Sequence, residues 1–149
     1  MITRRDFIVA GVSILITAAV IALAQPVAKP VMHSAIFNWK DIKVEQTKTG
    51  ELRGVFDSPT ATLEELEFHI TTLNPGEIPH LPHRHPEEEL MILKEGTLEA
   101  VQNDRTNRVE AGGIIFEASN ELHGVRNIGT NRATYYVIKF RPHDLPVAK

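Results

Sequence analysis

The chain has 149 residues, a length that suits one domain. Hydrophobic residues make up 42% of it and charged residues 23%, which is typical of a folded globular protein and argues against general disorder. The formal net charge of −3 shows no excess of basic residues, which argues against nucleic acid as a partner. Because the chain contains no cysteine, disulfides, thiolate metal ligands and a cysteine nucleophile are excluded, and histidine and carboxylate chemistry remains.

The first 24 residues have the layout of a secretory signal. Arg4-Arg5 precedes Phe7-Ile8, and the sequence then stays uncharged and mostly apolar as far as Ala24. A positive region, an apolar region and small residues before a proline are typical of a signal peptide. The arginine pair resembles that of bacterial twin-arginine signals, which a receptor reads. We predict an apolar signal helix, a twin-arginine signal peptide over residues 1–24, and a periplasmic or otherwise exported protein.

The alternative for this segment is an uncleaved membrane anchor. Residues 7–24 are just long enough to cross a hydrocarbon core of about 30 Å. In that case the domain would face the periplasm, and this segment would be its only contact with the membrane. Residues 25–38, with prolines at 26 and 30, are predicted to be a linker, so that residues 39–149 form the folded domain.

From Trp39 onward the chain is predicted to be all-β. Short alternating or β-branched runs recur, separated by turn residues roughly every 8–12 positions, and no helical period is convincing. This pattern is typical of a sandwich or barrel of roughly eight to ten strands. The expected strands cover residues 44–49, 51–56, 66–73, 89–93, 98–102, 114–116, 122–127 and 133–140.

The third of these runs carries charged side chains. Its apolar residues alternate along the strand, so that Glu67 and His69 fall on the opposite face. We expect His69 to be exposed on that face. The charge run of Glu64, Glu65 and Glu67 is interpreted as a solvated face or as protection of a sheet edge. Gly50 is expected to end the first run.

Two histidines and three carboxylates lie between Pro82 and Glu89. In extended backbone His83 and His85 point to the same side, and the flanking prolines favour extension of the residues before them. Glu89 shares their parity and begins an apolar run. Two imidazoles and a carboxylate suit a divalent transition metal such as Fe, Mn, Ni, Co, Cu or Zn. The segment therefore predicts part of a metal site.

A second segment supplies one more histidine. His123 follows Gly112 and precedes Asn127, and it begins an expected strand directly after an expected turn. Because barrel strands bring distant segments together, we expect His123 to reach the same place as the first two histidines.

Both segments resemble the motifs of the cupin superfamily. The first motif, Gly-x5-His-x-His-x3,4-Glu-x6-Gly, is matched with one extra residue after its first glycine. Its matching positions are Gly76, His83, His85, Glu89 and Gly96. The second motif, Gly-x5-Pro-x-Gly-x2-His-x3-Asn, is matched at Gly112, His123 and Asn127. Ala118 stands in place of the proline and Asn120 in place of the second glycine, a mild change because asparagine tolerates a left-handed turn.

This resemblance implies a fold, a ligand set and a partner. The fold is a single-domain double-stranded β-helix or jelly-roll barrel, of the small type-2, RmlC-like kind. The implied metal ligands are three histidines and one glutamate: His83, His85, Glu89 and His123. A homodimer is also expected from the resemblance, with residues 133–140 or the amino-terminal strand at its interface.

Other residues near the motifs are weaker candidates. His80, Arg126 and Tyr135 are candidate substrate-binding residues, since each could bring a polar group to the pocket. Glu87 shares the parity of Glu89, so it is the substitute ligand if the turn differs from the expected one. No residue is assigned a catalytic role.

Two functions are compatible with these residues. The first is an exported metalloenzyme of the oxygenase or isomerase type that acts on a small polar molecule. The second is a non-catalytic cupin that binds a small molecule such as a sugar or a carboxylate. A catalytic pocket should contain an acid–base or anion-binding group besides the metal ligands, whereas a binding pocket would have apolar walls only. The sequence leaves open whether the protein is an enzyme.

Overall fold

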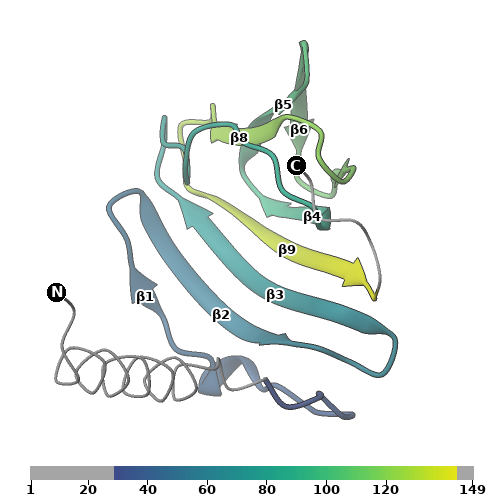
Figure 1. Ribbon diagram of the computed structural model, residues 1–149. Coiled ribbons are helices and arrows are strands. Elements are labelled where there is room, and N and C mark those ends of the chain that lie inside the picture. The colour runs from purple at the N-terminus through teal and green to yellow at the C-terminus, as the bar shows by residue number, and fades with distance from the viewer. Residues whose placement is uncertain (1–28, 144–149) are drawn as a thin grey trace, which may run out of the picture.

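The computed structural model describes residues 29–143 (Figure 1). The predicted signal segment, residues 1–24, lies outside the described residues. Within the described part, nine strands and one short 3-10 helix, η1 (Trp39–Asp41), make up the regular structure. The prediction of an all-β protein is therefore confirmed. Among residues 29–143, no helix is both long enough and apolar enough to cross a membrane.

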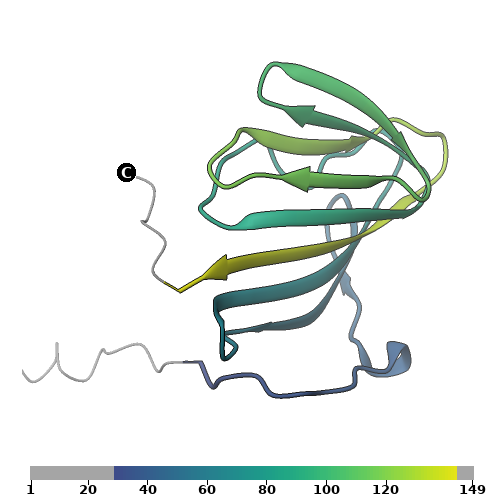
Figure 2. The same ribbon diagram turned by 90° about the vertical axis from the view of Figure 1, so that its right-hand side faces the viewer.

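The strands form two antiparallel sheets that face each other (Figure 2). The six-stranded sheet contains, in spatial order, β1 (Glu45–Gln46), β2 (Gly50–Ser58), β3 (Leu63–Leu73), β9 (Ala133–Pro142), β4 (Glu88–Glu95) and β7 (Ile114–Glu117). The three-stranded sheet contains β6 (Arg105–Glu110), β5 (Thr97–Gln102) and β8 (His123–Asn127). Two facing sheets of this kind are the architecture of a jelly roll.

The apolar core lies between the two sheets. Leu73, Leu93 and Leu98 are at most 1% exposed, and Met91 and Val137 are nearly as buried. Alternation along each strand sends these side chains inward and their neighbours outward. The core occupies one part of the interior, and polar side chains occupy the space beyond Met91 and Val137.

β3 is an internal strand, which corrects one prediction. It pairs with β2 on one side and with β9 on the other, so its charged residues cannot protect a sheet edge. Glu64 is exposed, Glu65 is partly buried, and both lie 3.5 Å from Arg141. Glu67 and His69 are also partly buried and face the interior. The interpretation of Glu67 as part of a solvated face or edge was wrong, because the pairing of β3 with β9 encloses it.

The first expected strand break is displaced. Gly50 was expected to end a strand, but it is the first residue of β2, and the turn is formed by residues 47–49. The amide of Thr47 donates to the carbonyl of Gly50, which closes this turn. β1 is accordingly reduced to two residues.

β9 is the central strand of the larger sheet. Both of its edges are paired, with β3 and with β4, so residues 133–140 offer no free edge to a second copy of the chain. The amino-terminal segment runs along the outside of β2 and β3 (Figure 2). There Phe37 packs against Phe56, with ring centroids 5.3 Å apart, and the guanidinium of Arg53 lies over the ring of Trp39.

Candidate metal centre

Three histidines from two distant segments lie side by side. His83 belongs to the segment before β4, and His123 is the first residue of β8. The two residues form an antiparallel bridge in which each backbone amide donates to the other's carbonyl at 3.0 Å. The bridge fixes the two segments at the backbone level, so the imidazoles are positioned before any ligand is considered.

Two neighbouring residues permit this close approach. A side chain at Gly124 would place its Cβ 3.2 Å from Pro82, so glycine lets the histidine segment lie directly on β8. Asn120 adopts a positive φ of 62°, and its amide donates to the carbonyl of His85 at 2.8 Å. Asn120 therefore makes the left-handed turn that the second cupin motif usually builds with glycine.

The hydrogen bonds of two rings determine where their lone pairs point. Nδ1 of His123 lies 2.8 Å from the carbonyl of Glu121, and Nδ1 of His85 lies 3.1 Å from the carbonyl of Glu87. A carbonyl accepts only, so each Nδ1 carries the proton and each Nε2 carries a lone pair. These two Nε2 atoms face each other at 3.2 Å.

This arrangement fits a divalent transition metal. Two lone pairs at 3.2 Å repel each other unless a proton or a cation lies between them. Two nitrogens that each ligate one ion at about 2.1 Å lie about 3 Å apart, so the observed spacing suits ligation. Nδ1 of His83 is buried and has no hydrogen-bond partner among residues 29–143, which leaves it able to donate its lone pair. Each of the three histidines offers one ring nitrogen to the centre, and these three nitrogens lie within 4.8 Å of one another.

Glu89 lies beside this group on β4. It is 9% exposed, and its Oε2 is 3.5 Å from Nε2 of His85. The Glu89 carboxylate raises the pKa of His85, because it stabilises a proton at Nε2 when no metal is bound there, whereas burial lowers the pKa of His83. Among residues 29–143 the clustered ligating atoms belong to the three histidines, and Glu89 contacts His85 on the side of Nε2.

Glu87, the predicted substitute ligand, occupies a different position. One of its oxygens lies 3.3 Å from Nδ1 of His85, the nitrogen that points away from the centre, and the other lies 3.3 Å from Nε of Arg141. Glu87 therefore contacts the outer side of the ring and can orient His85, as carboxylates behind metal-bound histidines do.

A cavity of about 370 Å³ opens in front of the histidines. This volume lies in the range of small-molecule sites. Its walls combine apolar side chains, such as Leu52 and Val125, with polar ones. Of the weaker candidates, His80 lies at the wall with its ring 4.3 Å from that of His83, and Tyr135 lines the cavity while only 2% exposed. Burial raises the pKa of the Tyr135 hydroxyl, so this group stays protonated.

Arg126 is not among the residues that line the cavity. It is exposed, and its Nε donates to the carbonyl of Gly76 at 3.2 Å, which ties β8 to the turn after β3. Asn127, the last residue of the second motif, is fully buried and donates to the carbonyls of Leu73 and Asn131. Both residues hold loops in place near the site.

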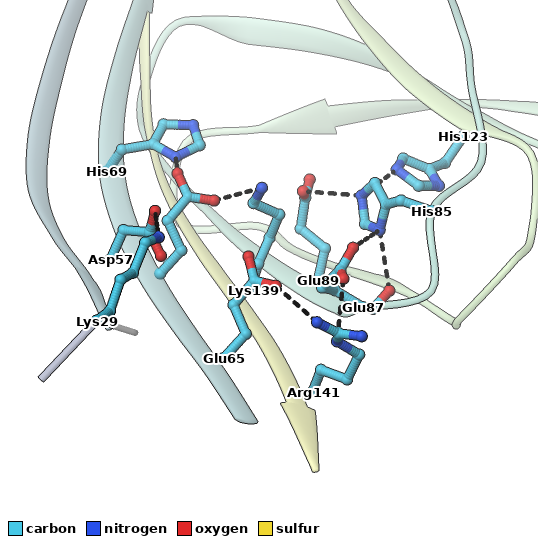
Figure 3. Close-up of polar contacts among 11 residues, drawn as sticks. Lys29, Asp57, Glu65, His69, His85, Glu87, Glu89, His123, Lys139 and Arg141 are labelled. Atoms are coloured by element: carbon cyan, nitrogen blue, oxygen red, sulfur yellow. Dashed lines mark hydrogen bonds and ion pairs between the residues drawn. The ribbon is translucent and has the colours of Figure 1, made fainter. Parts of the chain in front are cut away.

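A second polar group on the six-stranded sheet was missed by sequence reasoning. Nδ1 of His69 lies 2.7 Å from Glu67, and Glu67 forms an ion pair with Lys139 of β9 (Figure 3). The expectation that His69 is exposed was wrong, because its side chain is 20% exposed and lines the cavity. The spacing of Glu67 and His69 placed them on one face, but only the pairing of β3 with β9 shows that this face is the inner one.

One further buried carboxylate borders the centre. Glu117 of β7 lies directly opposite Glu89 and is 2% exposed. Its Oε2 accepts a hydrogen bond from Nε2 of Gln102 at 3.1 Å. Burial raises the pKa of Glu117 to about 7.

Known proteins resemble this chain in sequence and in structure. Residues 69–139 match the family model described as the cupin domain. No curated protein sequence matches the chain. An RmlC-like cupin from Shewanella frigidimarina NCIMB 400 is 12% identical, with a TM-score of 0.61, and the match covers 75% of this chain and 95% of that one.

Two other solved structures have similar folds. A predicted oxalate decarboxylase from Thermotoga maritima is 18% identical over 72% of this chain and 99% of that one, with a TM-score of 0.59. The polyketide cyclase RemF from Streptomyces resistomycificus is 21% identical over 76% of this chain and 88% of that one, with a TM-score of 0.58. The family match covers residues 69–139, just under half of the chain, and these solved structures share the fold of this chain.

Proposed function

We propose that this protein is an exported metalloenzyme of the oxygenase or isomerase type that acts on a small polar molecule. Its metal centre consists of His83, His85 and His123 with Glu89. The observation that carries the proposal is the pair of Nε2 atoms 3.2 Å apart, each left with a lone pair by a carbonyl at Nδ1. When bound, a divalent transition metal supplies Lewis acidity or redox chemistry at this point.

The walls of the cavity support catalysis over simple binding. Besides the histidine centre they carry Glu67, His69 and Lys139, which are acid–base and charged groups of the kind that a catalytic pocket needs. Two of the structural neighbours bear the names of enzymes, a predicted oxalate decarboxylase and a polyketide cyclase. The alternative function is a non-catalytic cupin that binds a sugar or a carboxylate, for which the apolar part of the walls would suffice.

The residues around the centre have separate tasks in this proposal. The bridge between His83 and His123 fixes the ligand geometry, and Glu87 orients His85 from behind. The cavity admits only a small molecule, since its volume of about 370 Å³ is near the lower end for such sites. Nitrogen and oxygen atoms at the walls favour a ligand rich in oxygen.

Export and assembly are part of the proposal. The amino-terminal sequence supports a twin-arginine signal over residues 1–24, which would place the protein in the periplasm, or attach it to the membrane there if the segment is not cleaved. A homodimer is proposed from the cupin resemblance.

Metal analysis of the purified protein tests the function. We expect close to one transition metal ion per chain in the wild type, and none in His83→Ala or His123→Ala. His143→Ala is the matched control, because His143 is exposed outside the centre and its loss should leave the metal content unchanged. Full metal retention in both centre variants would overturn the proposed site.

A ligand screen then separates the enzyme from the binder. Small acids and sugars that occupy the cavity raise the melting temperature of the metal-loaded protein. Turnover of a stabilising compound supports the enzyme, and stabilisation without turnover for every such compound supports the binding protein.

A further inference from the structure

The wall opposite the histidine centre contains a histidine held by a carboxylate. Nδ1 of His69 lies 2.7 Å from Oε1 of Glu67, and the other oxygen of Glu67 pairs with Lys139. The three side chains come from neighbouring strands, since Glu67 of β3 lies in register with Lys139 of β9. A continuous series of polar contacts, from lysine to carboxylate to imidazole, therefore crosses this wall.

The position of this group relative to the centre follows from the strand register. Lys139 of β9 is paired in register with Glu67 of β3 and with Glu89 of β4. The three residues therefore form one row across the inner face of the six-stranded sheet. Neighbouring strands are about 4.8 Å apart, which puts β3 about 10 Å from β4. Figure 3 shows His69 at one end of the row and Glu89 with His85 at the other. A small molecule between the two ends can contact both.

The hydrogen bonds leave one nitrogen of His69 ready to accept a proton. Glu67 is an acceptor, so Nδ1 carries the proton and Nε2 carries the lone pair. Among residues 29–143 no hydrogen bond is made to Nε2 of His69, and the side chain lines the cavity. Figure 3 shows the second nitrogen of His69 on the side of the ring away from the dashed contact at Nδ1. Burial lowers the pKa of His69, which keeps the imidazole neutral and able to act as a base near pH 7.

Glu67 is suited to hold the ring in this state. Lys139 forms an ion pair with the Glu67 carboxylate, and the carboxylate in turn fixes the tautomer and rotation of the imidazole through its contact with Nδ1. An imidazole fixed by a carboxylate is the arrangement in which a base is oriented by a third group. Filling the core would not require it, because an apolar side chain could occupy the same space without a buried charge.

We infer that His69 is a proton-accepting catalytic residue, positioned by Glu67, that removes a proton from an oxygen-rich small molecule held at the histidine centre. A C–H or O–H bond of that molecule breaks, its electron pair stays on the molecule, and the proton forms a new bond to Nε2 of His69. Return of the proton to a different atom completes an isomerisation with no oxidant or reductant. The inference rests on the proposed function and selects its isomerase branch.

Chemical modification of the metal-loaded protein tests the state of the ring. Diethyl pyrocarbonate reacts with an accessible unprotonated imidazole nitrogen, and mass spectrometry locates the product. We expect His69 to be modified, and we expect Glu67→Gln to lower the pH midpoint of this reaction by about one unit, because a nearby carboxylate raises an imidazole pKa. The groups facing His69 across the row, Lys139 and Glu89, stay unchanged in this variant. No modification at His69, or an unchanged midpoint, would overturn the inference.

Protection by oxalate tests whether the two walls face one ligand. Oxalate is a small bidentate oxygen ligand for a transition metal. We expect it to stabilise the metal-loaded protein against heat and to slow the modification of His69 at least about tenfold, with His143 as the unprotected control. Stabilisation without protection of His69 would overturn the inference and leave the metal centre standing. Absence of metal, or of stabilisation by oxalate, counts instead against the proposed function.

The variant His69→Gln completes the test. It should keep the full metal content and the stabilisation by oxalate, because His69 is not a metal ligand in this proposal. Loss of metal from His69→Gln would show that the residue belongs to the metal centre, which contradicts its assignment as a separate base.

Discussion

The two walls of the cavity are built in different ways. The histidine wall takes His83, His85 and His123 from segments at strand ends, tied together by a bridge between backbones. The opposite wall takes Glu67 and Lys139 from the middle of two long paired strands. A cluster at strand ends can be recognised from local spacing, whereas a cluster across strands exists only through the register of the sheet.

The two walls also differ in their electrostatics. On the histidine wall, two lone pairs face each other, and the repulsion is relieved by a cation or a proton. On the opposite wall, the charges of Glu67 and Lys139 compensate each other, and His69 adds a neutral base. One wall is therefore suited to hold a metal and the other to exchange a proton.

The largest expected effect is a loss of metal affinity that occurs on changing the histidine wall and not on changing the opposite wall. His85→Ala should weaken metal binding by more than about 100-fold, because changes to residues behind ligands already cost 10–100-fold. Glu67→Ala should change the affinity by less than about threefold. Competition with a chromogenic chelator measures both affinities. Equal losses in the two variants would show that the walls form a single metal site.

The next effect tests whether both walls depend on one core. Leu93 is 1% exposed and packs on the inner face of β4, in register with Tyr135. Leu93→Ala should lower the free energy of unfolding by about 2–5 kcal/mol, through lost burial and a cavity. Urea unfolding followed by the fluorescence of Trp39 and by metal release should give one transition. Two separate transitions would show that the walls unfold independently.

A smaller effect tests the charge balance of the opposite wall. Lys139→Met leaves Glu67 partly buried without its counter-charge, which should cost about 1–3 kcal/mol of unfolding free energy. The metal content should not fall. Lys43→Met is the control, since Lys43 is exposed and its loss should change stability by less than about 0.5 kcal/mol. A loss as small as that of the control would show that the ion pair contributes nothing.

The smallest effect concerns Glu117, next to the histidine wall, in metal-free protein. Its folded pKa of about 7 exceeds the usual 4.5, so the folded state holds this proton where the unfolded state has lost it. Wild-type stability should therefore fall as the pH rises from 4.5 through 7. Glu117→Gln should be about 1–2 kcal/mol more stable than the wild type at pH 8 and nearly equal to it at pH 5. Urea titrations at both pH values measure this, and a difference independent of pH would contradict it.

Part of the fold and of the site could be predicted from the sequence. Alternating runs and turn residues predicted an all-β chain, and the nine strands among residues 29–143 confirm it. Asparagine at position 120 was expected to tolerate a left-handed turn, and the positive φ of Asn120 confirms this. Two other expectations failed because the position of a turn and the pairing of a strand depend on contacts with residues elsewhere in the chain. Gly50 begins a strand because the turn forms three residues earlier, and β3 is internal because β9 returns to its free side.

The sequence by itself determined that His83 and His85 share a face and that a third histidine was available at position 123. Those features depend on strand alternation and on motif spacing, which are local. Only the tertiary structure decided that His69 and Glu67 face the cavity together with Lys139. Their side of β3 becomes the inner side through hydrogen bonds to a strand about 70 residues later in the chain, and no local pattern carries that register.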